Sequence, residues 1–129
     1  MDHERFKKQL NFILEIDKEK QILRQTHIRG YSRQEDDAEH AWHMAVMAFL
    51  LQEYSNEKID IGRTMLMLLI HDLVEIDAGD TYAYDAEANK TKDEREHKAA
   101  ERIYGLLPED QGKMLMDLWL EFEAYETPE

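Results

Sequence analysis

The adjacent residues His71 and Asp72 stand at the end of an apolar run, MLMLLI, where polar side chains are unexpected. A carboxylate beside so much hydrocarbon is costly unless a partner offsets the water that it loses. Glu75 follows His71 by four residues and Asp72 by three, so the three groups can converge on one side of a helix. An imidazole and two carboxylates in this position suggest a cation between them. Such donors suit Mn, Fe, Co, Ni or Zn better than Ca.

A structural interpretation of the same residues stays open. His71 could cap the end of a helix while Asp72 and Glu75 face solvent. The apolar run before them weakens this alternative but does not remove it.

A second polar group, DDAEHAWH at 36–43, carries His40 and His43 three residues apart. Either or both could point inward from a helix. The acids of this group suit a helix N-terminus, where they cap the first turn and interact favourably with the helix dipole. We interpret most of these acids, and also His43, as structural. Spacing alone does not choose between the two histidines.

Apolar residues recur at helical spacing along most of the chain and predict five or six helices without a convincing strand. We expect the third helix to be buried in the bundle, because its centre is apolar on all sides. Two capping-box patterns, Asp36 with Glu39 and Thr91 with Glu94, mark helix starts. The expected helices are 4–26 with a break near Asp17, 36–50, 60–76, 91–107 and a last one from Pro108, with loops at 27–34 and from Gly79. The fold class is therefore all-α.

Composition limits the classes of protein to which the chain can belong. Its 129 residues suit one domain, and the absence of cysteine excludes disulfides and thiolate metal sites. The net charge of −13 argues against binding a nucleic-acid backbone. The charged N-terminus does not resemble a signal peptide, and the longest apolar run is too short to cross a bilayer. We expect a cytoplasmic protein that binds neither nucleic acid nor membrane.

Two segments together resemble the HD-domain phosphohydrolases, and more narrowly their 5′-deoxynucleotidase branch. The first is RQEDDAEH at 33–40, and the second is LIHDLVEIDAGD at 69–80. The histidine–aspartate pair alone is a weak match, but the order and spacing of both segments are specific. The resemblance runs from about Asp17 to Glu129. It implies a single helical HD domain and a hydrolase that uses one divalent metal ion (Mn, Co, Fe, Ni, Zn or Mg).

The resemblance also assigns roles to individual residues. His40, His71 and Asp72 match metal ligands. Glu75 matches an acid that orients the attacking water, and Asp80 matches a catalytic residue beside the sugar and scissile phosphate. Three further positions match substrate-binding residues: Arg24 for the phosphate, with Arg33 and Glu35 at the mouth of the site. The implied substrate is a (deoxy)nucleoside monophosphate.

One departure from the family pattern concerns its fourth metal ligand, an Asp on a later helix than any in this chain. Neither Asp110 nor Asp117 has a matching context. Relative to the family, the chain is expected to be short at its C-terminal end and to expose apolar surface, which favours a homodimer. The alternative function is a non-catalytic or weakly active HD scaffold that binds metal or nucleotide and self-associates.

Overall fold

The structure, a computed structural model, describes residues 3–27, 33–78 and 91–124. Helices dominate these ranges, which confirms the all-α prediction apart from one short two-stranded sheet. The elements are α1 (His3–Ile16), the 3-10 helix η1 (Asp17–Gln21), β1 (Leu23–His27), β2 (Gln34–Asp36), α2 (Asp37–Leu51), the 3-10 helix η2 (Gln52–Tyr54), α3 (Ile61–Ile70), α4 (Glu75–Ala78), α6 (Lys92–Tyr104) and α7 (Glu109–Ala124).

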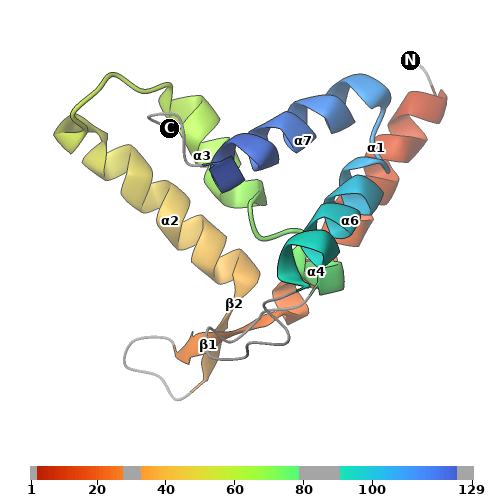
Figure 1. The fold of residues 1–129 in the computed structure, drawn as a ribbon, viewed down its shortest axis with the longest axis horizontal. Helices are drawn as coiled ribbons and strands as arrows, with labels where there is room; N and C mark the ends of the chain where they lie inside the picture. The colour runs from red at the N-terminus through yellow and green to blue at the C-terminus, as the bar shows by residue number, and fades with distance from the viewer. Residues whose placement is uncertain (1–2, 28–32, 79–90, 125–129) are drawn as a thin grey trace.

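The helices form two groups that meet along α3 (Figure 1). On one side α2 packs along α3, and on the other side α1, α6 and α7 lie together, with α7 also contacting α3. The hydrophobic core lies mainly in this second group and in the turn after α3. Its buried members are Phe12, Met67, Ile70, Leu73, Val74, Ala99, Ala100, Ile103, Tyr104, Leu107, Leu115, Leu118 and Trp119.

The helix predicted for 60–76 is interrupted in the structure. It begins as expected, with the side chain of Asp60 accepting a hydrogen bond from the Arg63 amide at 3.1 Å, but α3 ends at Ile70 and α4 begins only at Glu75. Between them the chain turns, so that Leu73 and Val74 enter the core. Packing of these two side chains overrides the helical pattern. The break leaves residues 71 and 72 in a tight connection rather than on a helix.

The break predicted near Asp17 is present, because α1 ends at Ile16 and η1 begins at Asp17. The helix predicted to continue to residue 26 was wrong, since β1 begins at Leu23, and strands border the loop predicted for 27–34. Strands β1 and β2 pair in antiparallel fashion, with Leu23 opposite Asp36 and His27 opposite Gln34. Asp36 has an extended backbone (φ −86°, ψ 166°), which suits both the end of a strand and the residue before a helix. The hairpin therefore places β1 next to the start of α2.

One predicted capping box forms and the other does not. Asp36 accepts a hydrogen bond from the Glu39 amide at 2.8 Å, and the Asp36 amide donates to the Glu39 side chain at 3.0 Å. Thr91 precedes α6 with a ψ angle of 3°, and its side chain makes no capping hydrogen bond. An extended backbone is needed to aim the hydroxyl at the first turn, so this second prediction was wrong.

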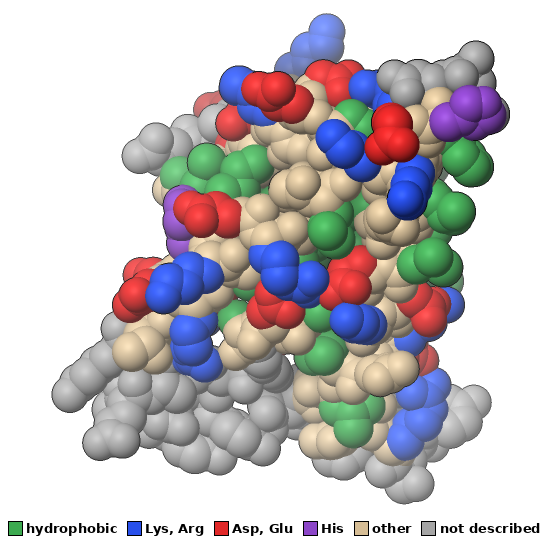
Figure 2. All heavy atoms as spheres, turned by 90° about the vertical axis from the view of Figure 1, so that its right-hand side faces the viewer, with side chains coloured by type: hydrophobic (Ala, Val, Ile, Leu, Met, Phe, Trp, Pro, Cys, Tyr) green, Lys and Arg blue, Asp and Glu red, His purple; other side chains and the backbone are tan. Residues whose placement is uncertain are grey.

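A shared arginine connects three helices beside the core. The guanidinium of Arg102 in α6 donates to Glu15 of α1 at 2.6 Å and to Asp77 of α4 at 2.5 and 2.8 Å. Figure 2 shows acidic and basic side chains close together across this face of the molecule. The large negative charge of the chain is therefore offset locally by ion pairs.

Apolar side chains are also exposed, as expected from the family comparison of the sequence. Most lie on α1 and α2, among them Phe6, Leu10, Ile13, Leu14, Trp42, Phe49 and Leu50, and others lie on α3 and α7 (Leu69, Met114 and Leu120). Among the described residues, no helix has the length and apolar composition that crossing a bilayer requires.

The phenol of Tyr104 links α6 to the end of α3. It is buried and donates a hydrogen bond to the Ile70 carbonyl at 3.0 Å. We expect Tyr104→Phe to lower the free energy of unfolding by about 0.5–1.5 kcal/mol, because one hydrogen bond is lost while the Ile70 carbonyl keeps the Leu73 amide as a donor at 3.1 Å. Urea denaturation measures this change. Tyr54→Phe is the matched control, since Tyr54 is 73% exposed; equal stability of the two variants would contradict the prediction.

Candidate metal centre

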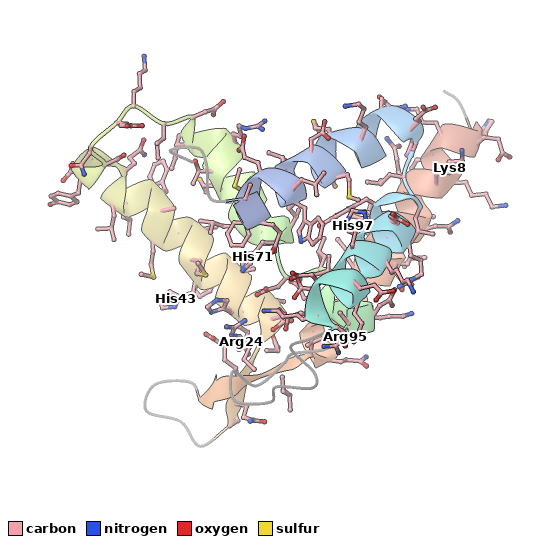
Figure 3. All side chains as sticks on the ribbon, in the orientation of Figure 1. Lys8, Arg24, His43, His71, Arg95 and His97 are labelled. Carbon is pink, nitrogen blue, oxygen red and sulfur yellow. The ribbon has the colours of Figure 1, made fainter. Side chains whose placement is uncertain are left out.

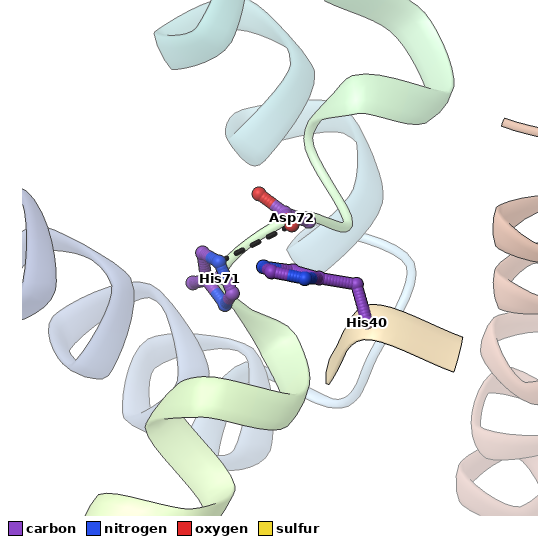
Figure 4. A group of neighbouring side chains, drawn as sticks. All are labelled: His40, His71 and Asp72. Carbon is purple, nitrogen blue, oxygen red and sulfur yellow. Dashed lines mark ion pairs between the residues drawn. The ribbon is translucent and has the colours of Figure 1, made fainter. Parts of the chain in front are cut away.

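The three predicted metal ligands lie close together although they belong to different elements. His40 lies in the first turns of α2, and His71 and Asp72 lie in the connection between α3 and α4. One nitrogen from each histidine and one oxygen of Asp72 all lie within 4.8 Å of one another (Figure 4). Two imidazoles and a carboxylate suit a first-row divalent metal ion. We call these three residues the metal centre.

His71 is held with one ring nitrogen toward the backbone and the other toward the centre. Its Nδ1 lies 2.6 Å from the Leu68 carbonyl, so Nδ1 carries a proton and donates it. Its Nε2 lies 3.2 Å from Asp72 Oδ2. Burial lowers the pKa of His71, but the hydrogen bond and charge of Asp72 outweigh it, and the net pKa is raised. A backbone partner on one nitrogen is the usual way in which a protein fixes the orientation of a metal-binding histidine.

The structure separates the two histidines of α2, which spacing could not do. His40 Nδ1 lies 3.2 Å from Glu35 Oε1, while the exposed ring of His43 stacks on Trp42 with 6.1 Å between ring centroids. Burial and the charge of Arg24 lower the pKa of His40, which favours the neutral ring that a metal ion needs. His43 therefore lies outside the group that His40 forms with His71 and Asp72.

Arg24 reaches the metal centre from β1. Its Nη1 donates a hydrogen bond to Asp72 Oδ2 at 3.1 Å, and its Nε lies 3.9 Å from Glu35 Oε1. Although burial raises the pKa of Asp72, its hydrogen bonds with His71 and Glu75 and the charge of Arg24 lower it to about 2. Asp72 is therefore an anion at any neutral pH. Figure 3 shows Arg24 beside the N-terminal end of α2, below His71.

A second acidic group adjoins the metal centre and shares one residue with it. Oxygens of Asp37, Asp72 and Glu75 all lie within 4.8 Å of one another. Glu75 is the first residue of α4 and is buried, as its predicted role beside the centre requires. Asp37 is completely buried, although its place in the sequence predicted a capping acid at the start of α2.

A buried glutamate in η1, Glu19, was also missed. It is 6% exposed, and its Oε2 has no hydrogen-bond partner among the described residues. Burial, together with the charges of Asp37 and Asp72, raises the pKa of Glu19 to about 7. The stretch DKEKQ gave no signal for this, because a run of charged residues normally faces solvent.

The raised pKa of Glu19 predicts a pH-dependent stability. Between pH 4.5 and about 7 the folded protein holds more protons than the unfolded chain, so stability is lost as the pH rises through this window. We expect Glu19→Gln to raise the free energy of unfolding at pH 8.5 by up to about 3 kcal/mol, with little change at pH 4.5. Urea denaturation at several pH values tests this. The exposed control Glu57→Gln should follow wild type; parallel curves for wild type and Glu19→Gln would contradict the prediction.

Comparison with known proteins adds to this geometry. A family model described as "HD domain" matches residues 16–129, which is most of the chain. The chain belongs to the HD-domain family. His40, His71 and Asp72 all lie within the residues that this family model matches.

Similar proteins include the human and mouse 5′-deoxynucleotidase HDDC2, which are 34% and 33% identical over 101 residues. These matches cover 78% of this chain but only 48% and 49% of the relatives, so the chain spans about half of their length. A crystal structure from Magnetospirillum magnetotacticum, described as a predicted metal-dependent phosphohydrolase, is 56% identical with a TM-score of 0.89. That match covers 96% of this chain and 62% of the other.

Three further residues of the HD domain were predicted to belong to the site: Arg33, Glu35 and Asp80. Arg33 donates to Glu39 at 2.9 and 2.6 Å, so in this structure its guanidinium is engaged at the start of α2. Glu35 contacts His40 and Arg24, so it lies next to the metal centre. Asp80 lies outside the described residues. The structure therefore brings together Arg24, Glu35, His40, His71, Asp72 and Glu75.

Proposed function

We propose that this HD domain is a metal-dependent phosphohydrolase that removes the 5′-phosphate of (deoxy)nucleoside monophosphates. The observation that carries the proposal is the convergence of His40, His71 and Asp72 beside the buried carboxylate of Glu75. The names of the relatives, 5′-deoxynucleotidase and metal-dependent phosphohydrolase, support the same class of reaction.

The donor set fits one divalent metal ion. His40, His71 and Asp72 would hold it, with the ring of His71 oriented by Leu68 and that of His40 by Glu35. Such an ion supplies Lewis-acid polarisation of the phosphate and lowers the pKa of a water molecule. The donors accept Mn, Fe, Co, Ni, Zn or Mg, and we expect competition among them to follow availability as well as affinity.

Each remaining side chain has a proposed task. Glu75 accepts a proton from the attacking water, whose oxygen bonds to phosphorus while the bond to the 5′-oxygen breaks. Asp80 assists the leaving oxygen or positions the sugar. Arg24 binds the phosphate through charge-assisted hydrogen bonds, and Arg33 adds positive charge at the mouth of the site. The products are a nucleoside and inorganic phosphate.

Phosphate release from a panel of nucleoside monophosphates tests this function. Mn²⁺, Co²⁺ and Mg²⁺ are added separately to the purified chain, and deoxyribose and ribose substrates are compared for each base. We expect release that depends on the metal and stops on chelation. Metal-independent release, or none from a folded chain, would count against the proposal.

A second proposal concerns assembly, and exposed apolar side chains on α1 and α2 favour it. We propose that the chain self-associates as a homodimer through part of this surface. If activity is absent, the alternative function, an HD scaffold that binds metal or nucleotide, would apply. Analytical ultracentrifugation distinguishes the assembly states; a monomer at all concentrations would exclude the dimer.

A further inference from the structure

Asp37 is a fully buried carboxylate that the proposed reaction does not use. Its side chain is 0% exposed, and it is the first residue of α2. A buried carboxylate is costly unless it is paired. Arg24 provides a pair, with 3.6 Å between Arg24 Nη1 and Asp37 Oδ1. Asp37 is thus paired with the same arginine that contacts the metal centre.

Backbone contacts also hold the segment of Arg24 next to the segment of Asp37. The Asp37 amide donates to the Ile22 carbonyl at 2.9 Å, and Leu23 pairs with Asp36 across the hairpin. The strand that carries Arg24 is therefore attached to the helix turn that carries Asp37.

The second anionic partner of Arg24 is Asp72, which is also a proposed metal ligand. Arg24 Nη1 lies 3.1 Å from Asp72 Oδ2, and the side chain of Arg24 is only 23% exposed. Coordination of a cation would commit the negative charge of Asp72 to that cation. Two carboxylates would then remain beside Arg24: Asp37 at 3.6 Å and Glu35, whose Oε1 lies 3.9 Å from Arg24 Nε. Of the two, Asp37 is the closer and is fully buried, and Glu35 also contacts His40.

We propose that Asp37 is a positioning residue that holds Arg24 beside the metal centre and directs its guanidinium to the substrate phosphate. This inference rests on the proposed function, because it takes Arg24 as a phosphate-binding residue. Asp37 acts only through Arg24. It touches neither the phosphate nor the reacting water.

A purely structural role for Asp37 has different consequences. An acid at a helix N-terminus stabilises the helix by its interaction with the dipole. Loss of that interaction would lower stability without changing how the folded enzyme binds its substrate. Asp36, the neighbouring acid and N-cap residue of α2, shares the dipole interaction, but the acids paired with Arg24 among the described residues are Glu35, Asp37 and Asp72. Asp36→Asn is therefore a matched control, since asparagine also caps helices well.

The test compares KM and kcat for a nucleoside monophosphate across four proteins: wild type, Asp37→Asn, Arg24→Met and the double variant. We expect Asp37→Asn to raise KM roughly tenfold, in the range of coupling between neighbouring charges, with a smaller change in kcat. Arg24→Met should raise KM on the order of 100-fold. In the Arg24→Met background, Asp37→Asn should have no further effect on KM.

Two results would overturn the inference. The first is equal KM values for Asp37→Asn and Asp36→Asn. The second is a KM effect of Asp37→Asn that persists in full without Arg24. If wild type itself releases no phosphate, the proposed function fails, which is distinct from either of these results.

A crystal structure of wild type with Mn²⁺ and inorganic phosphate needs no variant and does not depend on turnover. We expect Arg24 to contact the phosphate while its guanidinium stays within about 4 Å of the Asp37 carboxylate, the limit for an ion pair. This result would support the inference even if Asp37→Asn did not fold. An Arg24 that binds phosphate after leaving Asp37, or that stays on Asp37 without touching the phosphate, would contradict it.

Discussion

His71→Ala should abolish both metal binding and phosphate release. His71 supplies one of the three ligands in the metal centre, and its ring is held in place by the Leu68 carbonyl. If the binding free energy of a metal site is shared among about four ligands, removal of one weakens binding roughly 100- to 1000-fold. Calorimetric titration with Mn²⁺ measures the loss of affinity, and phosphate release measures the loss of activity.

His43→Ala provides the control for this variant. His43 lies on the same helix as His40, three residues further on, but its ring is exposed and stacks on Trp42. It should bind Mn²⁺ and release phosphate as wild type does. Metal affinity that survives His71→Ala, with the fold intact by circular dichroism, would remove His71 from the set of ligands.

Glu75→Gln should separate chemistry from metal binding. Glu75 is buried, and one of its oxygens lies within 4.8 Å of an oxygen of Asp72. Glutamine keeps the size of the side chain but cannot accept the proton of the attacking water. We expect kcat to fall about 10²- to 10⁴-fold, the range of a positioned general base, while Mn²⁺ affinity changes much less than in His71→Ala.

Glu19→Gln is the matched control, because Glu19 is another buried glutamate close enough to respond to the charge of Asp72. At pH 8.5, where Glu19 is ionised, the substitution removes one negative charge without touching the proposed reaction. Its kcat should stay close to that of wild type. A kcat for Glu75→Gln that equals that of Glu19→Gln would show that general electrostatics, and not proton transfer, accounts for the effect.

The sequence predicted the centre of the site because His71 and Asp72 are out of place at the end of an apolar run. It did not predict that these two residues lie in a turn between α3 and α4. The pattern MLMLLI continues into Leu73 and Val74 at helical spacing, and only packing against α6 and α7 shows that the chain must bend there. His40 was chosen over His43 by resemblance, since spacing treats the two alike. The structure distinguishes them by their partners.

Asp37 and Glu19 were not predicted, for one physical reason. Each lies in a stretch of charged residues, and such stretches normally face solvent, so the local pattern assigns both residues to the surface. Their burial depends on the hairpin of β1 and β2, which brings Arg24 and η1 against the start of α2. The residue types in these strands, LRQTH and QED, do not alternate between apolar and polar as in a typical half-buried strand. No local feature of the sequence therefore indicated that the hairpin packs against the start of α2.

The most direct test of the metal centre is an anomalous-difference map from crystals of the full chain grown with Mn²⁺. The account predicts one peak about 2.0–2.3 Å from a nitrogen of His40, a nitrogen of His71 and an oxygen of Asp72. A peak held by Asp37, Asp72 and Glu75 without either histidine would contradict this assignment of ligands. Absence of any peak at a saturating Mn²⁺ concentration would contradict the metal centre itself.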